Sequence, residues 1–348
     1  MTVYVTSTRT LRSIAELDAA GLIAPGERDA LEQVASRYAV AVTPEMTRLI
    51  EREASDDPIG KQFLPDAREL ETRADECSDP IGDEKFEQVA GLVHRYPDRV
   101  LLKVTHACPV YCRFCFRREM VGPGGAHTLD DAALDRAIGY IAGNPAISEV
   151  ILTGGDPLVL SARRIAELTR RLSAIPSVSV LRWHSRVPVV APETIDEAMI
   201  AALTGGGKAV YLSIHTNHPR ELSAAAREAI GRLADGGIVL LSQTVLLRGV
   251  NNDAATLEAL FRALVGLRVR PYYLHHLDRA PGTAHFRTTI AEGQAIMRQM
   301  RGRLSGLAQP AYVLDIPGGV AKVPIGPNYL DEESVRDPWG GRHDLDRG

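Results

Sequence analysis

The sequence predicts an α/β fold in which parallel strands alternate with helices. Short apolar runs rich in leucine and β-branched residues recur along residues 89–330, helical patterns separate most of them, and polar residues follow each run. Continuous apolar strands alternating with helices are typical of parallel βα units that are covered on both faces or closed into a barrel. The predicted strands cover residues 100–105, 149–153, 179–184, 209–215, 238–244, 270–275 and 311–315.

Amphipathic helical patterns occupy the connections between most of these strands. They cover residues 129–143, 162–174, 192–203, 221–236, 254–265 and 290–304. Polar, ligand-capable residues follow the strands in a cysteine-rich loop and then in TGGDP, WHSR, HTNHP, QTV, HHLD and DIPGG. In parallel βα folds the carboxyl ends of the strands carry the active site. The pattern therefore predicts an enzyme whose site is built from several strand ends.

Residues 1–88 lack the alternation of apolar strands and helices. Their pattern predicts a helical cap without a catalytic role. Helical periodicity covers residues 13–20, 25–38 and 44–54. Pro25 is well placed for the start of the second of these helices. Residues 56–84 are polar and rich in proline and acidic residues, which predicts an extended linker with little regular structure.

Composition restricts the class of protein. The 348-residue chain can bury a sizeable core, and a content of 45% hydrophobic and 24% charged residues is ordinary for a globular protein. The net charge of −4 argues against nucleic acid, because phosphate binding favours a basic surface. There is no signal-peptide pattern and no apolar run of about eighteen residues that could span a membrane. We expect a cytoplasmic protein with four reduced cysteines, of which Cys77 is a free thiol.

The stretch THACPVYCRFCFRREM, residues 105–120, contains Cys108, Cys112 and Cys115 in a C-x-x-x-C-x-x-C spacing. Three thiolates are one fewer than the four that complete an ordinary iron–sulfur or zinc site. A cubane cluster held by three cysteines leaves one iron open to a small-molecule ligand. The alternative is that the three are buried hydrophobic cysteines. Their clustering between arginines and aromatic residues favours the metal cluster.

Lys322 is unusual because lysine is rare in this chain. Five of the forty basic residues are lysines, and Lys322 lies in the nearly uncharged stretch DIPGGVAKVPIGPNY, which predicts a loop after the last strand. Burial there would lower its pKa and make the amine available for a Schiff base, as with pyridoxal phosphate. The phosphate would need cations. Arg95, Arg99 and the Arg117–Arg118 pair are candidates, the alternative being ordinary surface ion pairs.

The cysteine spacing resembles that of the radical S-adenosylmethionine (SAM) superfamily, whose cluster loop follows the first barrel strand. This resemblance implies that the amine and carboxylate of SAM bind the open iron. It also implies that Phe114 packs against the adenine of SAM. Gly154, Gly155 and Asp156 follow the second strand and resemble the glycine-rich motif that approaches the methionine amino group.

Over residues 89–330 the chain resembles the lysine 2,3-aminomutase family. The motifs that carry the resemblance are HRYPDRVLLKVTHACPVYCRFCFRR, ILTGGDPL, HTNHPRE, QTVLLRGVN, PYYLHHLD, HFRT and DIPGGVAKVPIGPNY. It implies a partial (β/α)6-type radical SAM barrel between the N-terminal extension and a short polar tail, residues 331–348. It also implies a 4Fe-4S cluster, SAM and pyridoxal phosphate, which together would move the 2-amino group of L-lysine to carbon 3. We further expect a reductant such as flavodoxin or ferredoxin and a homo-oligomer.

The resemblance also implies a role for individual residues. Arg117 would bind the substrate carboxylate, and Asp278 and Asp315 would bind the distal ammonium of lysine. The alternatives are an ion pair between Asp278 and Arg279, and a turn or cap role for Asp315. Further positions that match the motifs are His215, Asn217 and Gln243, expected near SAM, and Tyr96, expected beside pyridoxal phosphate.

The chain also departs from the long form of the family. That form continues with a cysteine-bearing tail that binds zinc across subunits, whereas no cysteine follows Cys115 here, so we expect no zinc. The length resembles the bacterial enzymes that supply β-lysine for modification of elongation factor P. The motifs are also compatible with an aminomutase for glutamate or arginine, a radical SAM enzyme without pyridoxal phosphate, or a non-catalytic cluster-bearing scaffold.

Overall fold

The computed structural model describes residues 8–51, 56–122, 128–331 and 333–345. Within them, seven parallel strands form the centre of one sheet and follow one another in chain order. These strands are β3 (Arg99–Thr105), β4 (Glu149–Gly154), β5 (Val180–Ser185), β6 (Ala209–His215), β7 (Val239–Leu246), β8 (Val269–His276) and β9 (Ala311–Asp315). Every strand predicted from an apolar run is present, and the predicted α/β fold with a parallel sheet is confirmed.

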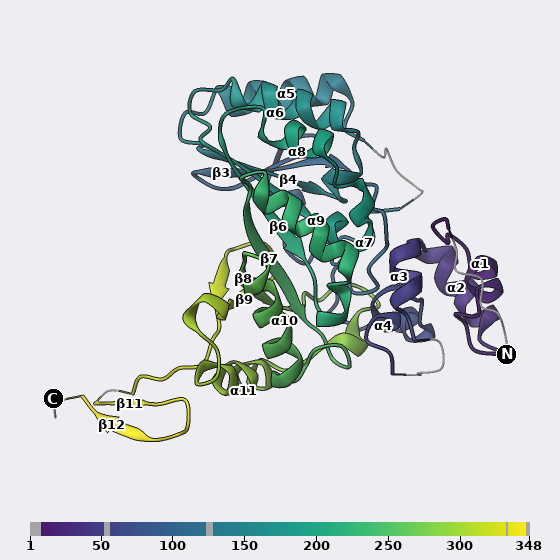
Figure 1. Cartoon of the computed structure of the whole chain (residues 1–348), viewed down its shortest axis with the longest axis vertical. Coiled ribbons are helices and arrows are strands. Elements are labelled where there is room, and N and C mark those ends of the chain that lie inside the picture. Colours follow the sequence, from purple (N-terminus) through teal and green to yellow (C-terminus); the bar gives the residue numbers. More distant parts are fainter. Residues whose placement is uncertain (1–7, 52–55, 123–127, 332, 346–348) are drawn as a thin grey trace.

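Helices connect the parallel strands, as the sequence predicts (Figure 1). They are α5 (Asp131–Ala142), α6 (Ala162–Ser173), α8 (Glu197–Thr204), α9 (Ala224–Asp235), α10 (Ala254–Gly266) and α11 (Ile290–Arg301). Each of the six begins after an aspartate, serine or threonine whose side chain accepts a hydrogen bond from the first turn. Such N-caps stabilise a helix by about 1 kcal/mol each. These short polar N-cap residues therefore determine where each connecting helix begins.

The sheet has antiparallel edges that the sequence did not indicate. On one side β1 (Glu87–Val89) pairs with β2 (Leu92–Tyr96), and β2 pairs with β3. On the other side β10 (Lys322–Pro324) pairs with β9, so that Lys322 lies opposite Asp315. The prediction that Lys322 lies in a loop is therefore wrong. These strands are short and contain no long apolar run, so periodicity gives little signal for them.

The two edges of the open sheet approach each other through side chains. The Tyr96 hydroxyl on β2 accepts a hydrogen bond from the backbone N–H of Lys322 on β10, with an O···N distance of 2.9 Å. Arg95 on β2 forms an ion pair with Asp315 on β9 at 3.8 Å. Strands from the first and last parts of the sheet therefore meet across a seam, which we define by these four residues. The sheet is curved into a partial barrel without a backbone ladder at the seam.

The N-terminal helices are shorter than the periodicity predicted. They are α1 (Ile14–Ala19), α2 (Arg28–Arg37) and α3 (Pro44–Leu49), followed by the single turn α4 (Gly60–Phe63). The second helix begins at Arg28, so the placement of Pro25 at its start is wrong. The third helix ends at Leu49 because Ile50 has extended backbone angles. The last part of the predicted continuation, residues 52–54, lies outside the described residues.

Residues 56–84 contain little regular structure, as predicted: the single turn α4, a short 3-10 turn, Ala67–Leu70, and another 3-10 turn that begins at Glu84. Their polar side chains are nevertheless buried: Gln62, Glu69 and Asp83 are each at most 1% exposed. Burial of such groups requires partners, because an unpaired buried charge is strongly destabilising. Each of the three has an arginine as a partner: Arg186 for Gln62, Arg113 for Glu69 and Arg117 for Asp83.

The polar tail contains a two-stranded hairpin, β11 (Ser334–Arg336) and β12 (Arg342–Asp344). In Figure 1 it extends away from the main sheet, at the yellow end of the chain. The side chain of Trp339 in its turn is 79% exposed. Among the described residues, every helix is too short or too polar to cross a membrane.

Candidate active site

The carboxyl ends of the parallel strands surround a cavity of about 540 Å³. Sixteen of the seventeen predicted site residues line it, and Asn217 does not. Those that do are Arg95, Tyr96, Arg99, Cys108, Cys112, Phe114, Cys115, Arg117, Gly154, Gly155, Asp156, His215, Gln243, Asp278, Asp315 and Lys322. Asn217 is buried beside the cavity wall, where its amide donates a hydrogen bond to Gln62 and accepts one from the Val245 N–H. One cavity therefore brings together residues from the whole length of the predicted barrel.

Cys108, Cys112 and Cys115 line this cavity from the loop that follows β3. Burial raises the pKa of Cys108 well above its usual value and that of Cys115 to about 11. Metal binding at these thiols would therefore release protons. Among the described residues no group of three or more His, Cys, Asp or Glu could hold a single metal ion. The donor set fits a cluster, in which each cysteine binds a different iron atom.

A buried ion cluster fixes the cysteine loop. Arg113, between Cys112 and Phe114, donates two hydrogen bonds to Glu69, with its Nε at 2.9 Å and its Nη2 at 2.5 Å. Arg118 also donates to Glu69, and its guanidinium lies over the ring of Tyr38 at 3.5 Å. Arg118 therefore points away from the cavity, where the sequence had suggested a phosphate ligand. Sequence reasoning missed Glu69, because one acidic residue in an acid-rich linker gives no signal of burial.

The glycine pair after β4 allows close packing against the cysteine loop. Gly154 has a φ of +116°, and a Cβ on Gly155 would lie 2.3 Å from the Ala107 carbonyl oxygen. The Asp156 carboxylate accepts hydrogen bonds from the Ser185 hydroxyl and the Arg186 N–H, both at 2.7 Å. Asp156 thus joins two strand ends, while the glycines leave their backbone on the cavity wall.

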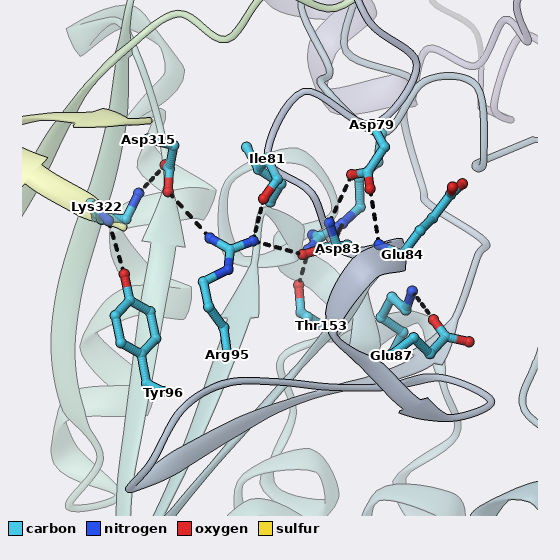
Figure 2. Close-up of polar contacts among 12 residues, drawn as sticks. Asp79, Ile81, Asp83, Glu84, Glu87, Arg95, Tyr96, Thr153, Asp315 and Lys322 are labelled. Atoms are coloured by element: carbon cyan, nitrogen blue, oxygen red, sulfur yellow. Dashed lines mark hydrogen bonds and ion pairs between the residues drawn. The ribbon is translucent and has the colours of Figure 1, made fainter. Parts of the chain in front are cut away.

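Charges of alternating sign line one wall of the cavity (Figure 2). The Lys322 ammonium pairs with Asp315, and Asp315 pairs with Arg95 at 3.8 Å. Arg95 lies 3.5 Å from Asp83, whose carboxylate accepts hydrogen bonds from Arg117 Nε at 3.1 Å and Nη2 at 2.7 Å. Burial opposes ionisation of Asp83, but Arg117 and the other nearby cations outweigh it and hold its pKa below the usual value. Asp83 comes from the predicted linker and was not expected here.

Asp278 differs from the other charged groups because its carboxylate has no hydrogen bond or ion pair to any described residue. Burial and the nearby charge of Asp315 raise its pKa to about 7. The Lys322 amine is 3.3 Å from His275 Nδ1 as well as paired with Asp315. Two carboxylates, one of them without a partner among the described residues, therefore lie beside the Lys322 amine. Such a pair attracts a further cation into the cavity.

Arg99 and the remaining predicted residues complete the walls. The Arg99 guanidinium lies 3.9 Å from the centre of the Tyr96 ring and pairs with Asp98 at 2.7 Å. Phe114 contacts His215 edge-on, with 5.6 Å between ring centres. Burial and the charge of Arg186 lower the pKa of His215 to about 3, so this imidazole is neutral. The Gln243 amide nitrogen lies 3.3 Å from Nε2 of His184, which the sequence presented only as part of WHSR.

Comparison with known proteins identifies the family. The Radical SAM superfamily model matches residues 102–260, and the Lysine-2,3-aminomutase model matches residues 297–337. An L-lysine 2,3-aminomutase from Acetoanaerobium sticklandii is 40% identical over 88% of this chain and 74% of its own length. The chain belongs to the lysine 2,3-aminomutase family. A putative L-lysine 2,3-aminomutase from Aquifex aeolicus is 39% identical over 90% of this chain and 85% of its own.

Membership of the lysine 2,3-aminomutase family makes this protein a radical SAM isomerase with a 4Fe-4S cluster and SAM. It also means that the enzyme acts on a small molecule and needs a reductant. The family name alone does not select the substrate. A glutamate 2,3-aminomutase from Clostridioides difficile is 35% identical over 87% of this chain and 71% of its own length. The choice between such substrates rests on the cavity.

The close approach of Gly155 to the cysteine loop gives a first prediction. Gly155→Ala would push the Ala107 carbonyl away and displace the neighbouring cysteine, because its Cβ has no room. We expect the rate of reductive SAM cleavage to fall about a hundredfold, the cost of a misplacement of about 1 Å. The control is Gly139→Ala on α5, where a Cβ would meet no atom within 4 Å. Equal cleavage rates in the two variants would contradict the packing argument.

Glu69 gives a second prediction. Glu69→Gln leaves the buried guanidiniums of Arg113 and Arg118 without a carboxylate, which should lower the free energy of unfolding by about 3–5 kcal/mol. Asp66→Asn removes a carboxylate from a half-exposed pair with Arg68 and should cost about 1 kcal/mol or less. Urea denaturation followed by circular dichroism measures both. A Glu69 variant no less stable than the Asp66 variant would show that the cluster is not stabilising.

Proposed function

We propose that this protein is an L-lysine 2,3-aminomutase that uses pyridoxal phosphate and interconverts L-lysine and β-lysine. The observation that carries the proposal is the pair Asp278 and Asp315, two carboxylates beside Lys322 in a cavity that also contains Arg117. Lysine needs one cation for its carboxylate and anions for its distal ammonium. Glutamate would bring a second carboxylate towards two carboxylates that are already there. Electrostatic repulsion therefore favours lysine.

Lys322 would hold pyridoxal phosphate covalently, with Arg95, Tyr96 and Arg99 around its phosphate. All four line the same cavity, and the buried Nε of Arg95 has no acceptor among the described residues. An unpaired donor next to the reactive amine suits a phosphate oxygen. Pyridoxal phosphate, when bound, supplies a carbonyl that carries the amino group and a ring that delocalises an unpaired electron. The protein supplies the amine, the cations and the orientation.

Binding of the substrate would use both ends of the charged wall. Asp83 occupies Nε and Nη2 of Arg117 and leaves Nη1, which lies 3.5 Å from the Thr153 hydroxyl. That nitrogen can donate to the substrate carboxylate. At the other end, Asp315 is paired with the Lys322 ammonium. Covalent use of that amine would free Asp315 to pair, together with Asp278, with the distal ammonium of lysine.

The reaction needs a radical because the hydrogen on carbon 3 is not acidic, so no side-chain base could remove it. SAM at the reduced cluster supplies that radical. Phe114, Gly154, Gly155, His215 and Gln243 would contact SAM, since they line the cavity next to the cysteine loop. Their task would be to position SAM and to exclude water. The low pKa of His215 keeps it uncharged beside the cationic sulfonium of SAM.

The source of electrons and the biological setting are also part of the proposal. A flavodoxin or ferredoxin would reduce the cluster, because these small proteins carry single electrons. The homo-oligomer, the cytoplasmic location and the lack of a zinc site stay predictions from the sequence. A role in supplying β-lysine for elongation factor P stays an alternative for the same reaction.

The decisive experiment assays the reconstituted enzyme without oxygen. L-Lysine, L-glutamate and L-arginine are supplied separately with SAM, pyridoxal phosphate and dithionite, and mass spectrometry measures each β-amino acid. We expect β-lysine alone. Formation of β-glutamate or β-arginine in its place would reject lysine as the substrate.

Lys322 provides a third prediction. Lys322→Ala should bind pyridoxal phosphate only reversibly, so that gel filtration removes it and the absorbance of the lysine adduct is absent. The iron content should stay unchanged, because Lys322 lies on β10 and not in the cysteine loop. Lys208→Ala, outside the cavity lining, is the matched control. Pyridoxal phosphate that stays attached to the Lys322 variant would exclude this lysine as its anchor.

The pKa of Asp278, about 7, provides a fourth prediction. A raised pKa means that the carboxyl group takes up a proton as the pH falls through 7, and only the ionised form attracts an ammonium. The KM for lysine should therefore rise about tenfold between pH 8 and pH 6. In Asp278→Asn the KM should be high and nearly independent of pH. The control is Asp135→Asn in a surface ion pair. Parallel profiles for the wild type and the Asp278 variant would contradict the assignment.

A further inference from the structure

Arg186 contacts a cluster cysteine directly. It follows the end of β5, and its Nη1 lies 2.8 Å from Sγ of Cys112. The guanidinium is buried, with only 5% of the side chain exposed. The other two cysteines are different. Cys108 and Cys115 receive backbone hydrogen bonds, from Asp156 and Arg117 respectively. Among the described residues a charged side chain therefore donates to one of the three thiols, that of Cys112.

The position of the Arg186 guanidinium is held from several sides. Its Nη2 donates to Glu221 Oε2 and to Gln62 Oε1, both at 2.6 Å. Its central carbon lies 4.5 Å from the centre of the Phe63 ring and 5.5 Å from that of Phe114. A planar guanidinium with fixed partners on its edge and rings beside it has little freedom to turn. The contact with Cys112 is therefore built into the fold.

The partners of Arg186 are themselves fixed. Glu221 Oε1 accepts hydrogen bonds from the backbone N–H groups of Asn217 and His218, both at 2.9 Å, and from the Gln62 amide at 3.1 Å. The Asn217 amide donates to Gln62 at 3.0 Å. These contacts explain why Asn217 is buried beside the cavity and does not line it. They connect the N-terminal segment, through Gln62, to the cysteine loop.

We propose that Arg186 tunes the iron–sulfur cluster: its Nη1 donates a charge-assisted hydrogen bond to the Cys112 thiolate and raises the reduction potential of the cluster. Reduction adds one electron and makes the cluster and its thiolates more negative. A cationic donor at a ligand sulfur stabilises this reduced form more than the oxidised form. Hydrogen bonds to cluster sulfurs are among the factors that set such potentials. Arg186 is thus a positioning and tuning residue, and its effect is independent of which amino acid is the substrate.

Glu221, whose carboxylate pairs with Arg186, limits the effect of Arg186 on the reduction potential to a short-range contact. Glu221 compensates the charge of Arg186 at 2.6 Å, so distant groups experience a nearly neutral pair. The Cys112 sulfur, by contrast, lies on the guanidinium side of the pair and contacts the N–H directly. The potential should therefore depend on the N–H···S contact more than on the net charge of the protein.

The test measures the midpoint potential of the reconstituted cluster by electron paramagnetic resonance during redox titration, without SAM or substrate. At the wild-type midpoint potential, the ratio of reduced to oxidised cluster should fall about tenfold in Arg186→Gln, which equals about 59 mV for a one-electron couple. The double variant Arg186→Gln with Glu221→Gln removes one positive and one negative charge and leaves no unpaired buried carboxylate. It should show the same direction of shift. Arg171→Gln, in a surface ion pair on α6, should leave the potential unchanged.

The outcomes separate tuning from other roles. An unchanged midpoint with full iron content would overturn the proposal, even if SAM affinity fell, because SAM is absent from the titration. Loss of iron from both Arg186 variants, with full iron in the Arg171 variant, would also overturn it and leave Arg186 a structural role. A shift to lower potential in the double variant with full iron content supports the proposal, whatever the substrate assays yield.

Discussion

The contact between the two edges of the open sheet is the constraint on which the site depends. Tyr96 and Arg95 on β2 reach Lys322 on β10 and Asp315 on β9, although the strands belong to opposite sides of the sheet. Side chains, and not a ladder of backbone hydrogen bonds between strands, make the contact between the two edges. The edge strands can therefore present a reactive amine and cations to the cavity, which a closed ladder of apolar residues would not allow. The contact between the sheet edges therefore brings all four seam residues into the lining of one cavity.

The site also depends on residues 56–84, which supply buried partners to the arginines around the cavity. Glu69 pairs with Arg113 and Arg118, and Asp83 pairs with Arg117. A buried guanidinium without such a partner would cost several kcal/mol, so these arginines cannot hold their positions without this segment. What composition suggested was a linker is part of the active-site wall. The positions of the cysteine loop and of Arg117 therefore depend on this segment.

The chemistry of the cavity separates into two regions. Around the cysteine loop, aromatic rings, glycine backbone and neutral imidazoles such as His215 surround the radical-generating end. Beside the seam, charges alternate from Lys322 through Asp315 and Arg95 to Asp83 (Figure 2). Asp83 in turn pairs with Arg117. The charged residues along this wall can orient a substrate that carries charges of both signs.

The sequence by itself determined the parallel strands, their helices, the cysteine motif and the exceptional Lys322. A strand buried on both faces must be continuously apolar, and a cluster needs three thiolates at close spacing. Lys322 is conspicuous because it is one of only five lysines in an arginine-rich chain. The tertiary structure decided the edge strands, the burial of Glu69 and Asp83, and the contact of Arg186 with Cys112. The contacts of Asp83, Glu69 and Cys112 with arginines join residues that lie from 34 to 74 positions apart. A charged residue looks the same in sequence whether its partner is water or a buried ion. Local sequence patterns indicate which side chains a segment must bury, whereas only the tertiary structure shows which charged groups pair.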